Sequence, residues 1–325
     1  MNLKKNNLKK IYGDASFRKF YRKYNKNYNS SVIVIASKEK EKNLLIYAAV
    51  NEIINKSGLS APKLILENYN KDFIEITDFG NESYYNILSK KQFKFNDYKK
   101  IINLLIKLQK IKIKKVKNFK NKIYKIPIYS KNLLIEESDL FYKWYLPLIF
   151  KKKKVSIIKQ KLKKKLDLNL SKLKFKNKIF VHRDFHISNL MKIKKNKIGI
   201  IDSQDAVIGN PAYDLVSLVD DVRIKTSTKL KNRIVNYYFK KCSGEYRMKK
   251  KIFLSDFNIL SIQRNLKILG IFSRLFMRDK KRKYLRLLPY TWKLLDLRMK
   301  DNPYLYDYYK YLKKNISKKI RNKKF

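Results

Sequence analysis

Both histidines of this 325-residue chain lie in one short segment, VHRDFHISNLM. His182, Arg183 and Asp184, followed by Asn189, have the spacing H-R-D-x-x-x-x-N. In that pattern the aspartate accepts the proton of an attacking hydroxyl and the asparagine binds magnesium. Asp202 follows the apolar run IGII, where a strand would deliver a second acidic ligand. Magnesium needs only one or two side-chain oxygens when nucleotide phosphates supply the rest. The segment therefore predicts phosphoryl transfer.

Each of these residues also has an ordinary structural interpretation. An aspartate such as Asp184 is common in turns, and a histidine such as His182 is often buried in support of a loop. The joint spacing with Asn189 and Asp202 favours the chemical interpretation. We interpret Arg183 and His186 as supports of the loop.

The composition excludes several other classes of protein. Apolar residues make up 44% and aromatic residues 14% of the chain, which is enough for a buried core. The 7 glycines do not form G-x-G-x-x-G or G-x-x-x-x-G-K-[ST], so dinucleotide-binding and Walker-type folds are disfavoured. The single cysteine, Cys242, allows neither an internal disulfide nor a cysteine/histidine zinc site.

The cysteine content fits a reducing compartment. No run approaches the roughly 18 apolar residues of a membrane span, and the start MNLKKNNLKK has no apolar signal-peptide core. We therefore expect a cytoplasmic protein without a membrane span, and a monomer.

The charge has two competing explanations. Lys and Arg number 80 against 26 Asp and Glu, a net charge of +54, which is the kind of excess that suits a nucleic-acid or anionic-membrane partner. The lysines are spread along the chain, however, as codon bias at ordinary surface positions would spread them. We favour the compositional explanation and do not expect a nucleic-acid partner.

The beginning of the chain is rich in strand signals. The segment FRKFYRKY, a polar turn and the run VIVIA predict a hairpin, and KLILENYNKDFIEI predicts a second one. Between them, apolar residues at helical spacing predict a helix over residues 39–56, with Gly58 as its stop. Past Gly80 helical periodicity dominates, with candidate helices at 96–111, 131–149 and 155–168. Short apolar runs at 178–201 form an exception, and helical character resumes from 211.

This pattern predicts an α+β protein with two unequal lobes. A β-rich lobe would occupy residues 1–80, and a mostly helical lobe residues 81–325.

The catalytic segment resembles that of the aminoglycoside phosphotransferase-like kinases, a branch of the protein-kinase-like fold that phosphorylates small molecules. Within that family the chain is most similar to bacterial anomeric kinases of N-acetylmuramate and N-acetylglucosamine in cell-wall recycling. The resemblance extends from about residue 13 to residue 275. It rests on the following further segments: GDASFRKFYR from Gly13, ITDFGNESYYNIL from Ile76, EESDLFYKWYL from Glu136, IDSQDAVIGNPAYDLVSLVDD from Ile201, and QRNLKILGIFSRL from Gln263.

The resemblance implies a nucleotide-binding N-lobe, a C-lobe with the catalytic loop and substrate site, and ATP and Mg²⁺ as cofactors. It implies that Asp184 is the catalytic base and that Asn189 and Asp202 hold the metal. Asp214 would brace the catalytic loop together with His182, although an acid at a helix N-terminus is an equally good explanation of Asp214.

The resemblance also implies nucleotide contacts. The segment from Gly13 through Ser16 to Arg18 would cover the phosphates, and the backbone of Glu75, Ile76 and Thr77 would be the hinge that meets adenine. Candidates for substrate contact are Asp205, which could face sugar or metal, and Arg264. Arg264 shares a helical face with Gln263 and Lys267, and for that face a structural buttress is the favoured alternative.

Two features depart from the kinase pattern. The strand VIVIAS lacks the lysine that protein kinases place on the α- and β-phosphates, so Arg18 or Arg22 would have to replace it. Ser203 follows the metal-binding Asp202, where the similar sugar kinases have phenylalanine. Loss of that ring removes about 1.5–3 kcal/mol of apolar transfer energy if the position is buried, without removing a ligand.

The leading hypothesis is an ATP- and magnesium-dependent kinase acting on a sugar hydroxyl, most simply the anomeric hydroxyl of an amino sugar. A polycationic aminoglycoside is a poor substrate for a chain with a charge of +54. The alternative is a catalytically weak kinase-like module that binds RNA or another polyanion. A protein kinase is disfavoured because the chain has no glycine-rich loop and no A-P-E motif.

Overall fold

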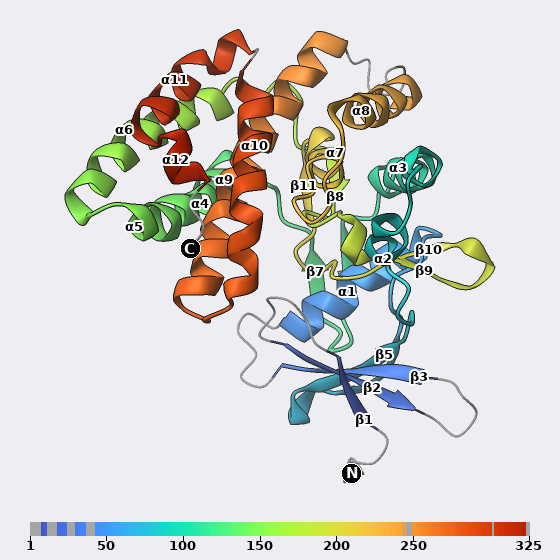
Figure 1. The fold of residues 1–325 in the computed structure, drawn as a ribbon. Coiled ribbons are helices and arrows are strands. Elements are labelled where there is room, and N and C mark those ends of the chain that lie inside the picture. Colours follow the sequence, from blue (N-terminus) through green and yellow to red (C-terminus); the bar gives the residue numbers. More distant parts are fainter. Residues whose placement is uncertain are drawn as a thin grey trace. The chain divides into compact units, whose positions relative to one another are not determined.

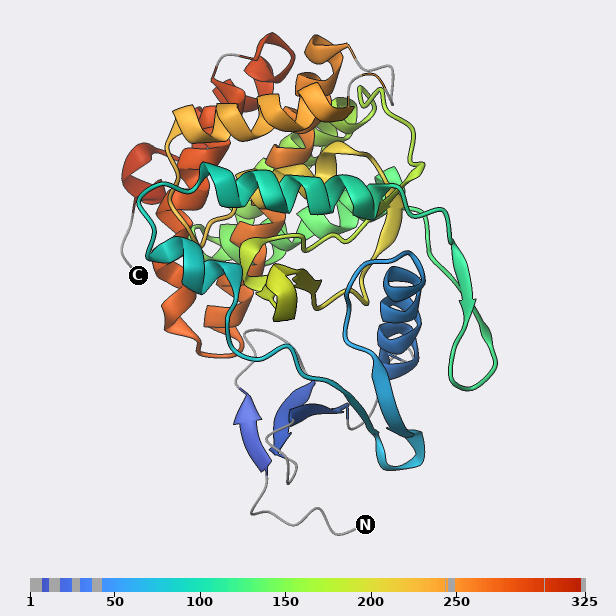
Figure 2. The ribbon, with the colours of Figure 1, turned by 90° about the vertical axis from the view of Figure 1, so that its right-hand side faces the viewer.

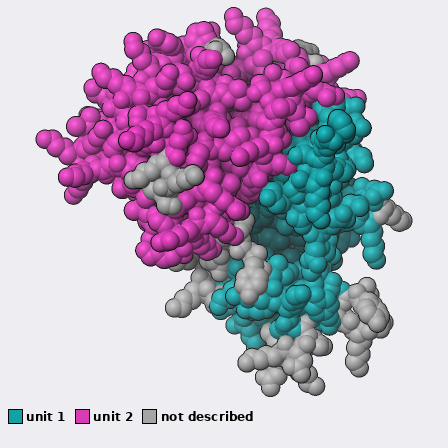
Figure 3. Space-filling view, viewed as in Figure 1, with its two compact units in different colours: residues 1–127, 182–207 teal, residues 128–181, 208–325 magenta. Residues whose placement is uncertain are grey.

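The structure is a computed structural model of the whole chain. It describes the following residues: 8–11, 18–24, 30–36, 43–242, 244, 249–300 and 302–322. Gly13 and Ser16, both predicted to contact the nucleotide, lie outside this set. The chain divides into two compact units (Figure 3): unit 1 comprises residues 1–127 and 182–207, and unit 2 comprises residues 128–181 and 208–325.

Unit 1 begins with a five-stranded antiparallel sheet in the order β1-β2-β3-β5-β4. The strands are β1 Leu8–Ile11, β2 Lys19–Tyr24, β3 Ser30–Ile35, β4 Leu64–Asn68 and β5 Phe73–Thr77. The β-branched residues of β3 and β5 suit a buried central position. Their inward side chains form an apolar core with Leu44 and Tyr47 of α1 (Asn43–Lys56), which covers the sheet (Figure 1).

The remainder of unit 1 carries the catalytic segment. Helices α2 (Tyr84–Ser89) and α3 (Phe95–Gln109) follow the sheet, and α3 leads into a hairpin of β6 (Lys115–Lys117) and β7 (Ile123–Lys125) (Figure 2). The later part of the unit contributes the 3₁₀ turn Ile187–Asn189, β9 (Leu190–Lys192), a 3₁₀ turn at Lys194–Asn196 and β10 (Ile198–Ile200). Backbone hydrogen bonds attach this hairpin to the rest of unit 1, from Ile200 N to Ser60 O (2.8 Å) and from Lys192 N to Glu82 O (2.8 Å).

Unit 2 is mostly helical, with β8 and β11 as a two-stranded sheet. Its core is the 28-residue helix α9, and α4, α7 and α10 pack against it. Gly270 of α9 permits a close approach, because a Cβ atom there would lie 2.2 Å from the backbone of Leu140. The elements are α4 Lys131–Leu140, a π-helical turn Phe141–Tyr145, α5 Leu146–Ile149, α6 Lys152–Leu170, β8 Ile179–Val181, β11 Val207–Gly209, α7 Ala212–Val219, α8 Thr228–Cys242, α9 Lys250–Met277, a 3₁₀ segment Arg282–Leu287, α10 Leu288–Met299, a 3₁₀ turn Pro303–Leu305, α11 Tyr306–Asn315 and α12 Lys318–Arg321.

The predicted α+β class is confirmed, and so are both hairpins and the helices expected past Gly80. Strand β1 and the β6–β7 hairpin were not predicted, because strands of only four and three residues give too short a pattern to recognise. The predicted boundary near residue 80 coincides with the end of the sheet. The compact units are divided differently, because residues 81–127 and 182–207 group with the sheet. Among the helices of the described residues, none combines the length and apolar character required to cross a bilayer.

A buried charge cluster joins four helical elements of unit 2. Asp220, which follows α7, accepts hydrogen bonds from Arg298 Nε (2.8 Å), Lys231 Nζ (3.3 Å) and Ser261 Oγ (2.7 Å). Burial alone would raise the pKa of the Asp220 carboxyl, but Arg298 and Lys231 hold that pKa well below its usual range. The cluster therefore depends on the charged form of Asp220.

We predict that Asp220→Ala lowers the free energy of unfolding by about 3–5 kcal/mol, because the buried Lys231 and the partly buried Arg298 lose their counter-ion. Urea unfolding followed by circular dichroism measures the change. Asp167→Ala is the matched control: Asp167 pairs with Lys131 at 2.8 Å, but the pair is about 40% exposed, and its loss should cost less than about 1 kcal/mol. Equal effects of the two substitutions would contradict a stabilising role of the cluster.

Candidate active site

The catalytic-loop segment is held by its own hydrogen bonds. His182 is completely buried, and its Nε2 donates to Ile201 O at 3.1 Å. The Asn189 side-chain Nδ2 donates to Asp184 O at 3.1 Å, and Ile201 N donates to Asn189 O at 3.0 Å. These bonds fix Asp184 and Asn189 next to the strand end that leads to Asp202. Because Nδ2 of Asn189 is the donor, the amide oxygen is the atom suited to bind a cation.

Two residues of this region have left-handed backbone conformations. Arg183 has φ 72° and Asp202 has φ 64°, which side chains with a Cβ atom rarely adopt. Such conformations cost free energy and persist where the surrounding structure imposes them, commonly at functional sites. Arg183 immediately precedes the predicted base Asp184, and Asp202 is itself a predicted metal ligand. The backbone therefore constrains the direction of the side chains at both places.

Three carboxylates converge here. Partial desolvation raises the pKa of Asp202, the nearby negative charges of Asp184 and Asp205 raise it further, and Arg18 opposes them. An excess of negative charge of this kind stabilises bound cations. The oxygen donors of Asp202 and Asn189 are the type that Mg²⁺ prefers, and two side chains suffice when phosphates complete the coordination. Within the described residues no group of three or more His, Cys, Asp or Glu side chains has the arrangement of a self-sufficient metal site.

Arg18 lies beside these carboxylates. Its Nη2 donates to Asp202 Oδ1 at 3.2 Å, and its guanidinium carbon is 5.3 Å from the centroid of the Tyr47 ring and 5.9 Å from that of Phe20. Burial raises the pKa of Tyr47 to about 12. The phenol of Tyr47 is therefore neutral at physiological pH and presents an uncharged ring to Arg18.

The Arg22 side chain is engaged by the segment that follows β5. Its guanidinium forms a bidentate pair with Asp78 and also donates to Gly80 O (3.0 Å) and Asn81 Oδ1 (2.6 Å). Burial would raise the pKa of Asp78, but the bonds from Arg22 and Ser30 lower it. Arg22 thus braces the segment that leaves β5, and the prediction that it contacts the nucleotide gains no support from this position.

The predicted hinge residues lie within the sheet. Ile76 pairs with β3 on one side and β4 on the other, Glu75 likewise, and Thr77 N donates to Lys63 O at 2.9 Å. The Glu75 carboxylate is buried and accepts hydrogen bonds from Ser31 Oγ (2.5 Å) and Lys23 Nζ (3.0 Å). Strand pairing occupies the backbone groups of these residues. The first backbone groups outside the sheet that could meet a nucleotide are those of residues 78–80, where the chain leaves β5.

Ser203, the residue after Asp202, is buried and paired. Ser203 Oγ donates to Asn51 Oδ1 of α1 at 2.5 Å, and both side chains are almost fully inaccessible. This bond links the Asp202 segment to α1, on which Tyr47 lies one helical turn before Asn51. Asn51 and Tyr47 therefore share the helix face that meets the Asp202 region.

The exposed Asp205 and the half-buried Tyr124 lie at the edge of the cluster. Arg183 Nη1 donates to Asp205 O at 3.2 Å and lies 3.8 Å from its Oδ1. Burial raises the pKa of Tyr124 of β7 to about 12, with a further contribution from Asp205. The sequence analysis missed Tyr124, because the only signal was a tyrosine between lysines in an unrecognised hairpin.

The remaining predicted residues belong to unit 2. Asp214 is fully buried in the first turn of α7, and Arg264 is buried in the middle of α9. Gln263 Nε2 donates to Leu134 O at 2.9 Å, which makes it a buttress between α9 and α4. Lys267 has the same role, since its Nζ donates to Glu137 Oε1 at 2.9 Å. The bracing role of Asp214 and the substrate role of Arg264 stay predictions.

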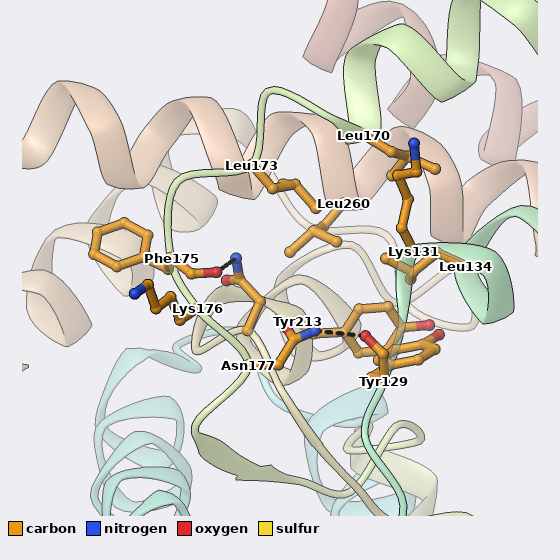
Figure 4. A pocket seen from close by; sticks show the side chains of 11 residues that line it. Tyr129, Lys131, Leu134, Leu170, Leu173, Phe175, Lys176, Asn177, Tyr213 and Leu260 are labelled. Atoms are coloured by element: carbon orange, nitrogen blue, oxygen red, sulfur yellow. Dashed lines mark hydrogen bonds between the residues drawn. The ribbon is translucent and has the colours of Figure 1, made fainter.

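Unit 2 contains a pocket of about 180 Å³, and none of the predicted site residues lines it. Its walls include Leu134, Leu170 and Leu260, with Asn177 Nδ2 donating to Tyr129 O at 2.7 Å at one side (Figure 4). The described geometry therefore places the candidate chemistry in unit 1, on the catalytic-loop segment and the sheet.

A five-stranded antiparallel sheet with one covering helix, followed by a mostly helical region, is the fold of kinase-like proteins. Solved structures support this fold. An aminoglycoside phosphotransferase in complex with gentamicin has a TM-score of 0.61 at 14% identity, covering 90% of this chain and 94% of that one. Plasmodium vivax ethanolamine kinase has a TM-score of 0.59 at 11% identity, covering 94% of this chain and 85% of that one.

Residues 7–249 match the family described as the phosphotransferase enzyme family, and the chain belongs to it. It is thus a kinase of the small-molecule type, a transferase that binds ATP. Among curated relatives, an N-acetylmuramate/N-acetylglucosamine kinase of Pseudomonas aeruginosa is 25% identical over 90% of this chain and 83% of its own length. The protein of the same name from Neisseria meningitidis serogroup B is 27% identical over 85% of this chain and 80% of its own length.

We predict that Ser203→Ala lowers the free energy of unfolding by about 1–3 kcal/mol, because Asn51 Oδ1 loses its donor in a buried position. Ser273→Ala is the matched control: Ser273 is equally buried, but its hydroxyl bonds to the helix carbonyl of Leu269, which the backbone ladder also satisfies. Urea unfolding compares the variants. Adding Asn51→Leu to Ser203→Ala should recover part of the loss, and a double variant whose loss equals the sum of the single losses would contradict the pairing.

We predict that the pKa of His182 in the folded protein lies below its usual value of 6.5. Burial lowers its pKa, and the interactions with Asp184 and Ile201 only partly oppose this. The unfolded state therefore binds a proton first, so the contribution to stability is complete above about pH 6.5 and is lost as the pH falls below that value. Nuclear magnetic resonance of the 2 histidines gives the titration directly. A His182 signal that titrates at or above pH 6.5 would overturn the assignment.

Proposed function

We propose that this protein transfers the γ-phosphoryl group of ATP, in the presence of Mg²⁺, to the anomeric hydroxyl of N-acetylmuramate or N-acetylglucosamine. The observation that carries the proposal is the convergence of Asp184, Asn189 and Asp202 in unit 1, held by hydrogen bonds between their own segments. The choice of sugar is supported by the names of the relatives that are 25% and 27% identical to this chain.

The chain's own residues have distinct tasks in this proposal. Asp184 orients the sugar hydroxyl and accepts its proton as the oxygen attacks the γ-phosphorus. Asn189 and Asp202 would hold Mg²⁺, whose charge offsets the charge on the phosphate oxygens. The backbone of residues 78–80, braced by Arg22, is the proposed adenine contact in place of Glu75 to Thr77. Most of the rate enhancement then comes from positioning and electrostatics.

The charge of the chain bears on the acceptor. At +54, the protein repels a polycation, whereas a neutral or carboxylated sugar meets no such penalty. An acceptor from cell-wall recycling and the need for ATP both favour the cytoplasm, so that location is part of the proposal. A monomeric state is a separate part of the proposal. Two features favour the alternative of a basic polyanion-binding module: the net charge and the missing strand lysine. The second is weakened, because Arg18 lies beside Asp202 and offers a cation there.

We predict that Asp184→Asn lowers kcat by about 10²- to 10⁴-fold, because the hydroxyl proton loses its acceptor. The assay measures ADP release with each sugar, and ³¹P nuclear magnetic resonance identifies the product. Asp167→Asn on the exposed face of α6 is the matched control and should retain full activity.

The methyl glycoside of N-acetylglucosamine tests the position of transfer, because its anomeric oxygen is blocked. It should not be phosphorylated. Turnover of the methyl glycoside would reject the anomeric hydroxyl as the acceptor, and the absence of turnover with every sugar would reject the proposed function. Binding of RNA that weakens steeply with salt would then favour the polyanion-binding alternative.

A further inference from the structure

The cation that replaces the missing strand lysine can be identified from the sheet register. Lys19 of β2 pairs with Ile35, the last residue of β3, so the preceding residue, Arg18, lies level with the chain just past β3. In kinases the phosphate-binding lysine is on β3. Arg18 therefore reaches the same end of the sheet from the neighbouring strand.

We propose that Arg18 is the cation that binds the phosphates of the nucleotide, and that its ion pair with Asp202 is the resting arrangement that the incoming phosphates replace. This inference rests on the proposed function, since it assigns a residue to the same nucleotide site. Arg22, the other candidate, is excluded because Asp78, Gly80 and Asn81 already engage its guanidinium.

The surroundings of Arg18 suit this task. Its guanidinium carbon lies 5.3 Å and 5.9 Å from the centroids of the Tyr47 and Phe20 rings. A guanidinium held in this way by aromatic rings keeps planar N–H groups for acceptors such as carboxylates and phosphates. One such acceptor is Asp202 Oδ1 at 3.2 Å, and the Asp202 side chain is 40% exposed. A phosphate that approached Asp202 would therefore approach the edge of Arg18 as well.

Tyr47 and Asn51 act as positioning residues for this pair. They are four residues apart on α1 and so share one face of the helix. Tyr47 packs under Arg18, and Asn51 receives the hydrogen bond from Ser203, next to Asp202. The helix thus fixes both members of the ion pair from one side.

The test compares the affinity for a non-hydrolysable ATP analogue with Mg²⁺ and the affinity for adenosine, both by calorimetry. Arg18→Gln should weaken binding of the analogue by about 10- to 100-fold, the value of a charge-assisted hydrogen bond. Adenosine has no phosphates, so its affinity should change by less than about twofold, which also shows that the variant is folded. Arg18→Lys keeps the charge but not the planar fork, so it should weaken binding of the analogue less than Arg18→Gln does.

Lys19→Gln is the matched control, because it removes an exposed cation from the adjacent position of the same strand. It should leave both affinities unchanged. If Arg18→Gln weakens binding of the analogue and of adenosine by the same factor, or changes neither affinity, Arg18 is only a structural partner of Asp202 and the proposal is wrong.

The outcome is separable from that of the proposed function. A wild-type protein that phosphorylates no sugar, but whose binding of the ATP analogue depends on Arg18, would refute the acceptor and support this inference. If the wild type phosphorylates the sugar and Arg18→Gln binds the analogue as tightly as the wild type does, the acceptor is supported and the role of Arg18 is refuted.

Discussion

Carboxylates that lie close together repel one another, and unit 1 places Asp184 and Asp205 near enough to Asp202 to disfavour its ionised form. The structure maintains this arrangement with local hydrogen bonds and left-handed backbone at Arg183 and Asp202. That cost is reasonable only where positive charge is to be bound. The rest of unit 1 can be understood as the means of holding these carboxylates in place.

The sheet and α1 contribute in two separate ways. Arg22 and Asp78 tie β2 to the segment that follows β5, so this pair stabilises the sheet at the point where the chain leaves it. The link from Ser203 to Asn51 ties the Asp202 segment to α1. Each contact joins residues far apart in the sequence. Together they relate the predicted metal ligand to the sheet without a contribution from the strand lysine of other kinases.

The strand signals and the spacing of the catalytic segment were sufficient to predict the hairpins, the helices past Gly80 and the grouping of Asp184 with Asn189. The separate roles of Arg18 and Arg22 could not be predicted. The two residues are four apart in an extended segment, and period-2 alternation assigns them to the same face. Their partners depend on which loops meet that face. The Ser203–Asn51 bond was unpredictable for the same reason, since neither residue alone indicates a partner 152 positions away.

The distribution of arginine explains how so basic a chain keeps its buried interactions specific. Lysine greatly outnumbers arginine in the sequence, yet the buried cations among the described residues are Arg18, Arg22, Arg264 and Arg321, with Lys231 as the single lysine. A planar guanidinium can bind a carboxylate and stack on a ring at once, which an ammonium group cannot do in the same geometry.

Drift toward lysine is therefore tolerated at exposed positions, where a charge is solvated and screened. It is resisted where a guanidinium holds two partners, as Arg321 does with Asp296 and the Trp292 ring. A surface selected to bind a polyanion would also be expected to retain arginine, because the guanidinium fork matches phosphate. The preference for arginine inside, with lysine left to the surface, is thus an argument that the charge of +54 is compositional.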